Sequence, residues 1–173
     1  MIAALITLCM LPFALSGCAT TTSAHASSAP MAVTRNYNFA GTIPVMPGSF
    51  AWPVHGPVIA SYGQDAKNGR NKGIDIAASE GAEIKAAKGG VVVFCDEKMK
   101  GFGKTVIIDH GGGFQTIYAY NSQITVKVGD TVNQSDVIAR AGQTGRAISP
   151  CVHFEIRRSG QPQDPDKYLS KNS

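Results

Sequence analysis

Hydrophobic and polar residues alternate in short stretches from about residue 49 onward. Runs such as "GIDIA", "GGVVVFC", "KTVIIDH", "FQTIYAY" and "CVHFEIRR" are rich in β-branched and aromatic residues and are separated by glycine-containing turns. Runs of this length, composition and punctuation are typical of β-strands. No window repeats apolar residues at helical spacing over enough positions to compete. The pattern predicts an all-β fold.

The clearest local element is a β-hairpin. Thr105–His110 and Phe114–Tyr120 are two strand-like runs joined by three consecutive glycines, a composition that suits a short hairpin loop. About 120 residues can bury one modest core. We therefore expect a single β domain over residues 49–173.

Residues 1–17 form a different kind of segment. An apolar stretch from Ile2 to Leu15 is too short to span a membrane comfortably and ends in small residues, as an export signal does. The sequence "LSGC" that ends at Cys18 resembles the bacterial lipobox, in which the cysteine becomes the lipidated first residue. We expect a lipoprotein signal peptide over 1–17 and lipidation of Cys18. An ordinary signal peptide that is cleaved nearby is the alternative.

Residue 19 is alanine rather than aspartate. Under the lipobox resemblance, this favours a periplasmic protein that is lipid-anchored to the outer membrane. Residues 18–48 are rich in alanine, serine, threonine, proline and glycine, so they predict a flexible tether rather than a core. Fully extended, a tether of this kind spans roughly 100 Å.

The overall charge is mildly positive. The chain of 173 residues holds 16 lysines and arginines against 12 aspartates and glutamates, a net charge of +4. This gives weak support to contacts with anionic surfaces such as cell-wall polymers or lipid headgroups. There is no basic run and no interleaving of basic with aromatic residues, so we expect no nucleic-acid binding.

The segments "FAWPVHGPVIASYG", "NKGIDIAASEGAEIKAAKGGVV", "GFGKTVIIDHGGGFQTIYAY", "AGQTG" and "VHFEIRRSGQPQDPDKYL" occur in this order. Together they resemble the LytM (lysostaphin-type) peptidase domain from Phe50 to Leu169. The resemblance implies an antiparallel β-sandwich with a groove at the zinc site. Active members of the family cut peptidoglycan peptides with one zinc ion, held by an H-x-x-x-D segment and the second histidine of H-x-H. Two further histidines, in Y-x-H and H-x-H, assist the water and the oxyanion.

Three of these five positions differ in this chain. Asn71 stands where the first ligand histidine is expected, while Asp75 and His153 are present. Tyr120 and Cys151 replace the two assisting histidines. Catalytic zinc usually takes three protein ligands, and a phenol with a pKa of about 10 is no base near neutral pH. We therefore expect no catalytic residue, no metal at the remnant positions and no cofactor.

Cys151 leaves three hypotheses open. The favoured one is a small residue that fills a vacated site, or a disulfide with Cys95, since the exported compartment is oxidising. A second is a thiolate ligand in a rearranged zinc site with Asp75 and His153. A third is a nucleophile paired with His153, which lies on the same strand face.

Two more histidines, His55 and His110, lie outside the family motifs. We interpret each as a surface or turn residue rather than a substitute ligand.

Domains of this family that have lost zinc ligands resemble the NlpD and EnvC type. Those domains bind and activate separate N-acetylmuramoyl-L-alanine amidases that split the septal wall in cell division. Here "NKGIDIA" is the NlpD-like form and "IYAYN" resembles the EnvC-like form. The resemblance implies a non-catalytic murein hydrolase activator whose partners are a periplasmic amidase, peptidoglycan and, through a lipid anchor, the membrane.

Side-chain alternation also predicts a binding groove. Tyrosines 118 and 120 alternate on one strand, and residues 151, 153, 155 and 157 alternate on another. Tyrosine and arginine are enriched at interface hot spots. The predicted partner-binding groove consists of Asn71, Lys72, Asp75, Tyr118, Tyr120, Cys151, His153 and Arg157.

Two other functions remain open at this point. A zinc metallopeptidase (peptidoglycan endopeptidase) with an altered ligand set predicts stoichiometric zinc and cleavage of wall peptides. A passive peptidoglycan-binding lipoprotein predicts binding to isolated sacculi without an effect on any amidase.

Overall fold

The computed structural model describes residues 49–66 and 69–171, and the structural statements below concern these residues. The predicted signal peptide (1–17), the lipidation site Cys18 and the tether (18–48) lie outside them. Within the described ranges, no helix has the length and apolar character needed to cross a membrane.

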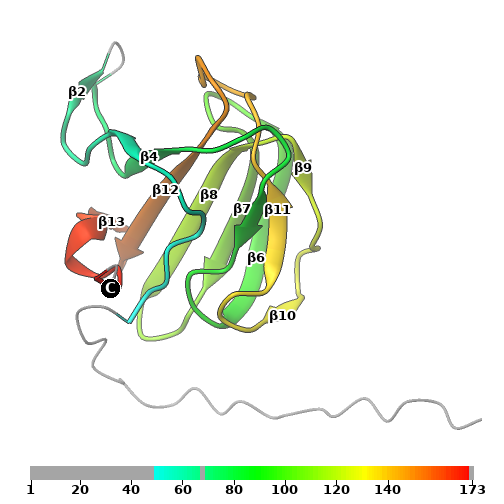
Figure 1. Ribbon diagram of the computed structural model, residues 1–173. Helices are drawn as coiled ribbons and strands as arrows, with labels where there is room; N and C mark the ends of the chain where they lie inside the picture. Colours follow the sequence, from blue (N-terminus) through cyan, green and yellow to red (C-terminus); the bar gives the residue numbers. More distant parts are fainter. Residues whose placement is uncertain (1–48, 67–68, 172–173) are drawn as a thin grey trace, which may run out of the picture. The chain divides into compact units, whose positions relative to one another are not determined.

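The described residues form thirteen strands and one short 3-10 helix (Figure 1). The elements are β1 (Val58–Ala60), β2 (Asp65–Ala66), β3 (Gly69–Arg70), β4 (Ile74–Ala77), β5 (Glu83–Lys85), β6 (Gly90–Met99), β7 (Gly103–Asp109), β8 (Phe114–Asn121), β9 (Gln123–Ile124), β10 (Thr131–Val132), β11 (Val137–Arg140), β12 (Cys151–Arg158), β13 (Gln161–Gln163) and η1 (Pro165–Lys167).

The strands form one large and two small sheets, and the strands within each sheet pair antiparallel. The large sheet has the order β1-β4-β12-β8-β7-β6-β10, with β13 on β12. A three-stranded sheet has the order β5-β11-β9, and β2 pairs with β3. The all-β, antiparallel prediction is confirmed. So is the hairpin, since β7 and β8 are joined through glycines 111–113, all at positive φ.

The core lies between the large sheet and the three-stranded sheet. Its fully buried side chains include Ile108 and Phe154 from the large sheet and Ile84 and Ile138 from the three-stranded one. Burying each such side chain contributes about 1.5–3 kcal/mol. The period-2 alternation seen in the sequence therefore corresponds to one core-facing side on each strand.

The first and last described segments are joined to each other. Phe50 and Leu169 form a parallel bridge, the Phe50 amide donates to the carbonyl of Tyr168, and the Ser170 amide donates to the carbonyl of Phe50. The indole of Trp52 donates to the Ser170 carbonyl at 2.9 Å. These two segments lie side by side at the lower end of the domain in Figure 1.

A buried polar chain runs through the core beside the hairpin. His110 Nδ1 lies 2.9 Å from the Gly89 carbonyl, and Nε2 lies 2.7 Å from the Thr116 hydroxyl. That hydroxyl lies 2.9 Å from the Tyr118 hydroxyl, which accepts from the Ala87 amide. The Gly89 carbonyl can only accept, so Nδ1 carries the proton of the neutral ring. Nε2 must then accept a hydrogen bond from the Thr116 hydroxyl, which in turn accepts one from the Tyr118 hydroxyl.

The interpretation of His55 and His110 as surface or turn residues holds for His55, which is exposed. His110 does lie beside the hairpin turn, but it is buried there and is not a surface residue. The pKa of His110 is lowered to about 4, chiefly by burial and also by the nearby Lys88, against the raising effects of the Gly89 hydrogen bond and Asp109. The ring is thus neutral at pH 7.

We expect the free energy of unfolding to fall as the pH drops from about 6.5 toward 4. The unfolded chain takes up the His110 proton near pH 6.5, but the folded chain only near pH 4. The stabilisation is complete above the unfolded pKa and is lost on acidification, by about 3 kcal/mol in total. Urea unfolding of the full chain at pH 7, 5.5 and 4 measures it. His110→Gln should flatten this pH dependence, and equal slopes in both proteins would contradict the assignment.

Candidate functional site

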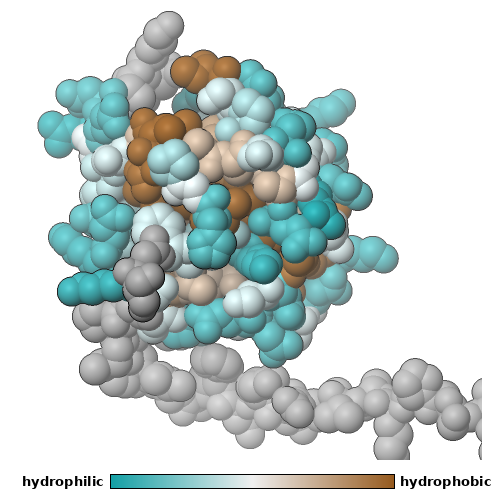
Figure 2. Space-filling view, viewed as in Figure 1, coloured by the Kyte–Doolittle hydropathy of each residue, from teal (hydrophilic) through white to brown (hydrophobic). Residues whose placement is uncertain are grey.

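A cavity of about 870 Å³ opens beside the start of β12. Its walls come from β1, the β2–β3 hairpin, the residues before β4, the turn after β6 and the loop before β12. In the orientation of Figure 1, hydrophobic side chains gather near β4 and at the loop before β12, at the upper end of the domain (Figure 2). The cavity lies where the sequence predicts the groove.

The structure brings most of the predicted site residues together. Those that line the cavity are Asn71, Lys72, Asp75, Tyr120, Cys151 and His153. Their role in binding a partner stays a prediction. Two predicted groove residues, Tyr118 and Arg157, do not line the cavity.

Tyr118 is a core residue, so its placement in the groove was wrong. Its side chain is fully buried, and its ring packs 5.4 Å from that of Phe154. Strict alternation puts Tyr118 and Tyr120 on one face. However, Tyr120 has a φ of 68°, which breaks the alternation at the end of β8. Its ring therefore enters the cavity and packs 5.4 Å from His153.

The bend at Tyr120 is held by its neighbours. The left-handed conformation costs a non-glycine residue about 1–2 kcal/mol. The Tyr120 amide donates to the carbonyl of Phe102, and the Asn121 side-chain amide donates to the carbonyls of Tyr118 and Lys104. These bonds tie the bend to Lys104 on the adjacent strand β7 and to Phe102 in the turn before it, so the ring of Tyr120 has a defined position.

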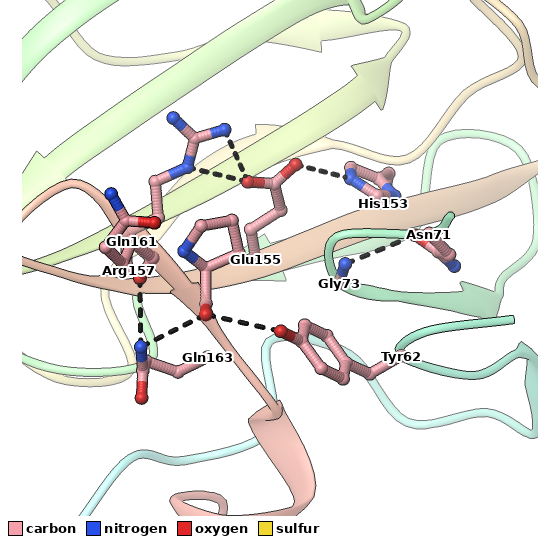
Figure 3. Close-up of polar contacts among 9 residues, drawn as sticks. Tyr62, Asn71, Gly73, His153, Glu155, Arg157, Gln161 and Gln163 are labelled. Carbon is pink, nitrogen blue, oxygen red and sulfur yellow. Dashed lines mark hydrogen bonds and ion pairs between the residues drawn. The ribbon is translucent and has the colours of Figure 1, made fainter. Parts of the chain in front are cut away.

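Four charged side chains form a continuous chain, and three of them, Asp75, His153 and Glu155, form the cavity floor. The antiparallel register sets His153 opposite Asp75, and His153 Nδ1 donates to Asp75 Oδ1 at 2.6 Å. His153 Nε2 donates to Glu155 Oε1 at 3.1 Å. Arg157 donates to Glu155 Oε2 from Nε at 2.8 Å and from Nη2 at 2.7 Å. Figure 3 shows the three members that lie on β12. We call these four residues the charge chain.

The charge chain keeps its histidine protonated. Burial alone lowers the pKa of His153, but hydrogen bonds to Asp75 and Glu155 outweigh it, so the pKa is raised. Burial raises the pKa of Glu155, but His153 and Arg157 outweigh it, so that pKa is lowered. Because each ring nitrogen faces a carboxylate oxygen, both must carry a hydrogen.

Arg157 was wrongly assigned to the groove wall, because its guanidinium turns to Glu155 instead. Glu155 itself does line the cavity, although it is fully buried. It was absent from the predicted groove set. The sequence did hold its signal, since Glu155 is in phase with Cys151 and His153 along one strand.

The residues present do not fit a catalytic zinc ion. Asn71 Oδ1 accepts from the amide of Gly73 at 3.2 Å, so it is turned to its own backbone (Figure 3). Both nitrogens of His153 are engaged. Burial, and then Asp75, raise the pKa of Cys151 to about 11, so the thiolate that zinc prefers is scarce at neutral pH. Among the described residues, no group of three or more His, Cys, Asp or Glu is placed to hold a metal ion.

Neither of the two replacement residues, Tyr120 and Cys151, has a pKa near neutral pH, so both side chains keep their proton there. Burial, followed by Asp75 and Cys151, raises the pKa of Tyr120 to about 12.

The hypothesis of a Cys95–Cys151 disulfide is contradicted, because both thiols are free. Cys95 lies on β6, three strands from β12, or roughly 14 Å at the usual spacing. A disulfide needs Cα atoms within about 7 Å.

Sequence reasoning missed the cavity residues that come from loops. Phe102 packs 5.4 Å from His153, and Arg146 and Ile148 form part of the wall before β12. Sequence reasoning also missed Ile59, which is not a loop residue but lies on the edge strand β1. Loops lack the alternation that marks strand faces. The available signal was an aromatic or basic residue flanked by glycine in "GFG" and "TGRAIS".

The family model described as Peptidase family M23 matches residues 69–165. Two similar curated proteins are Murein hydrolase activator EnvC of Escherichia coli (strain K12), 39% identical over 125 residues, and Lipoprotein NlpD/LppB homolog of Pseudomonas aeruginosa, 41% identical over 125 residues. Each alignment covers 72% of this chain, but only 30% and 41%, respectively, of those relatives. The chain thus spans less than half the length of either relative.

Among solved structures, a variant of the catalytic domain of the prophage-encoded M23 protein EnpA from Enterococcus faecalis superimposes with a TM-score of 0.61 at 30% identity. The match covers 70% of this chain and 98% of that domain. The fold class predicted from the sequence, an antiparallel β fold of the LytM/lysostaphin type, is thereby confirmed.

Restoring the first ligand position should create zinc affinity. In Asn71→His, an imidazole joins Asp75 and His153, which gives three ligands of the kind that zinc uses. Loss of a residue that hydrogen-bonds to a metal ligand typically lowers metal affinity by roughly 10–100-fold. Gain of a ligand should have a larger effect, so we expect the zinc affinity of the variant to exceed that of the unaltered chain by more than this factor. Isothermal titration calorimetry measures it. Gln123→His, at an exposed site on β9, is the control. Stoichiometric zinc binding by the unaltered chain at micromolar concentration would show instead that the present residues already hold the metal.

Proposed function

The chain belongs to peptidase family M23, and we propose that its domain is a non-catalytic murein hydrolase activator. In this proposal it binds and activates periplasmic N-acetylmuramoyl-L-alanine amidases in cell separation. The single observation that carries the proposal is the charge chain, which occupies the donor atoms a peptidase would offer to zinc while the cavity above it stays open. The names of the similar proteins, which include murein hydrolase activators, agree with it.

The chemistry of the cavity rim favours binding of a protein segment. Ile148 is 92% exposed and Ile59 is 48% exposed, and both line this one cavity, where they offer apolar area to a partner. Lys72 and Arg146 also line the cavity, and the part of the chain that the structure describes offers neither of them an ion-pair partner. Apolar contacts beside free cations suit an amphipathic segment with acidic residues. The volume is sufficient for several side chains of such a segment.

We also propose that the chain acts from the periplasmic face of the outer membrane, lipid-anchored through Cys18, with peptidoglycan as a further partner. Similar proteins named as lipoproteins support the envelope location.

A zinc endopeptidase is the competing function that the family raises. It is disfavoured by the turned-in side chain of Asn71, the engaged nitrogens of His153 and the protonated thiol of Cys151.

Dye release from labelled sacculi tests the proposal directly. We expect no release by the purified chain with zinc, and strong release when it is mixed with a periplasmic amidase that is inactive by itself. Release by the chain alone that a chelator abolishes would identify an endopeptidase instead. Binding to sacculi with no effect on any periplasmic amidase of the same organism would identify a passive wall-binding protein.

Substitutions on the cavity rim should weaken activation of the amidase without lowering the stability of the fold. Ile148→Asp and Lys72→Glu alter exposed side chains, so stability should change little, whereas loss of one interface hot spot costs about tenfold or more in affinity. The readouts are the amidase-dependent rate of dye release and the affinity for the amidase. Val128→Asp is the matched control, because Val128 is 60% exposed but does not line the cavity. Equal effects of Ile148→Asp and Val128→Asp would argue against the cavity as the binding surface.

A further inference from the structure

Every member of the charge chain is paired with opposite charge. Glu155 is fully buried, and its two oxygens are divided between His153 on one side and Arg157 on the other. In the same way, the two ring nitrogens of His153 bond to different partners, Nε2 to Glu155 and Nδ1 to Asp75. Two carboxylates and two cations sum to zero. A buried charge is costly unless it is paired and hydrogen-bonded, and this arrangement meets both conditions without any ion from solution.

The charge chain is also a cross-link between strands. Asp75 lies on β4, whereas the other three members lie on β12. The residues just before β4, Asn71 and Lys72, belong to the cavity wall. The bond between Asp75 and His153 therefore ties that wall to the floor. In a zinc site, the metal supplies this connection by binding ligands from both strands.

Two aromatic rings cover the centre of the charge chain. The rings of Phe102 and Tyr120 each lie 5.4 Å from that of His153, at interplanar angles of 64° and 45°. The side chain of His153 is only 7% exposed as a result. Tyr120 reaches this position only through a left-handed backbone conformation. Such conformations persist where the surroundings over-determine them, and here Phe102 and Asn121 supply the restraint.

We infer that the charge chain, covered by Phe102 and Tyr120, takes the structural place of the zinc ion and keeps the cavity in shape without a metal. Glu155 and Arg157 are then positioning residues, which act by fixing the His153 ring toward Asp75. This inference concerns how the cavity is maintained, so it holds whether or not the cavity binds an amidase.

Nuclear magnetic resonance of the full chain, labelled with nitrogen-15, tests the arrangement at pH 7. We expect two slowly exchanging ring N–H signals from His153, unchanged by equimolar zinc or by a chelator. A single ring N–H signal, or a zinc-dependent shift of the His153 signals with a rise in melting temperature, would overturn the inference. Since no amidase is present, failure of this test and failure of the proposed function are separate results.

Arg157→Met tests the positioning role, because it removes the charge but keeps most of the side chain. We expect His153 N–H exchange to quicken by about tenfold or more, with a lower urea midpoint. Arg158→Met is the matched control. Arg158 is next along β12 but stacks on Phe114, 5.3 Å from the ring centroid, outside the charge chain. Equal exchange rates in the two variants would overturn the role of Arg157.

A pair of substitutions at Tyr120 tests the aromatic cover of the charge chain, and it remains available if Arg157→Met does not fold. Tyr120→Phe keeps the covering ring and should leave N–H exchange of His153 within about twofold of the unaltered chain. Tyr120→Ala removes the ring and should speed exchange by about tenfold or more. Slow exchange in both variants would show that the aromatic cover does not protect the charge chain.

Discussion

The antiparallel pairing of β4 with β12 places His153 opposite Asp75, and the cavity depends on this register. A shift of β12 by one residue would turn His153 into the core and bring a core residue such as Phe154 to the cavity floor. The buried isoleucines of β4 and the phenylalanine of β12 prevent such a shift, because they must face the three-stranded sheet. Hydrophobic burial on one face of the sheet thus fixes ion pairing on the other.

Because burial on one face of each strand sets what lies on the other face, much of the structure could be predicted from the sequence. Period-2 alternation identified the strands, the hairpin and the common face of Cys151, His153 and Glu155, because each strand has one buried side. It failed at Tyr120, whose left-handed backbone ends the alternation through bonds to residues on other strands. It also could not place Phe102 or Ile148, since loop residues reach the cavity by tertiary folding without a repeating pattern.

Arg157 illustrates a different limit. Its place on the correct strand face was predictable, but its direction along that face was not. A buried carboxylate two residues away draws the guanidinium inward, where desolvation makes the pairing strong. This chain resembles in fold a protein named as a peptidase, and in sequence a protein named as an activator. Donor atoms in one cavity, rather than architecture, therefore distinguish these chemistries.

The bonds that join Phe50 and Trp52 to Leu169 and Ser170 have a mechanical consequence. These segments meet at the end of the domain away from the loops that wall the cavity (Figure 1). A pull on the chain at residue 49 acts directly on these backbone bonds. The described domain is thus fastened at this end by bonds that share no residue with the cavity lining.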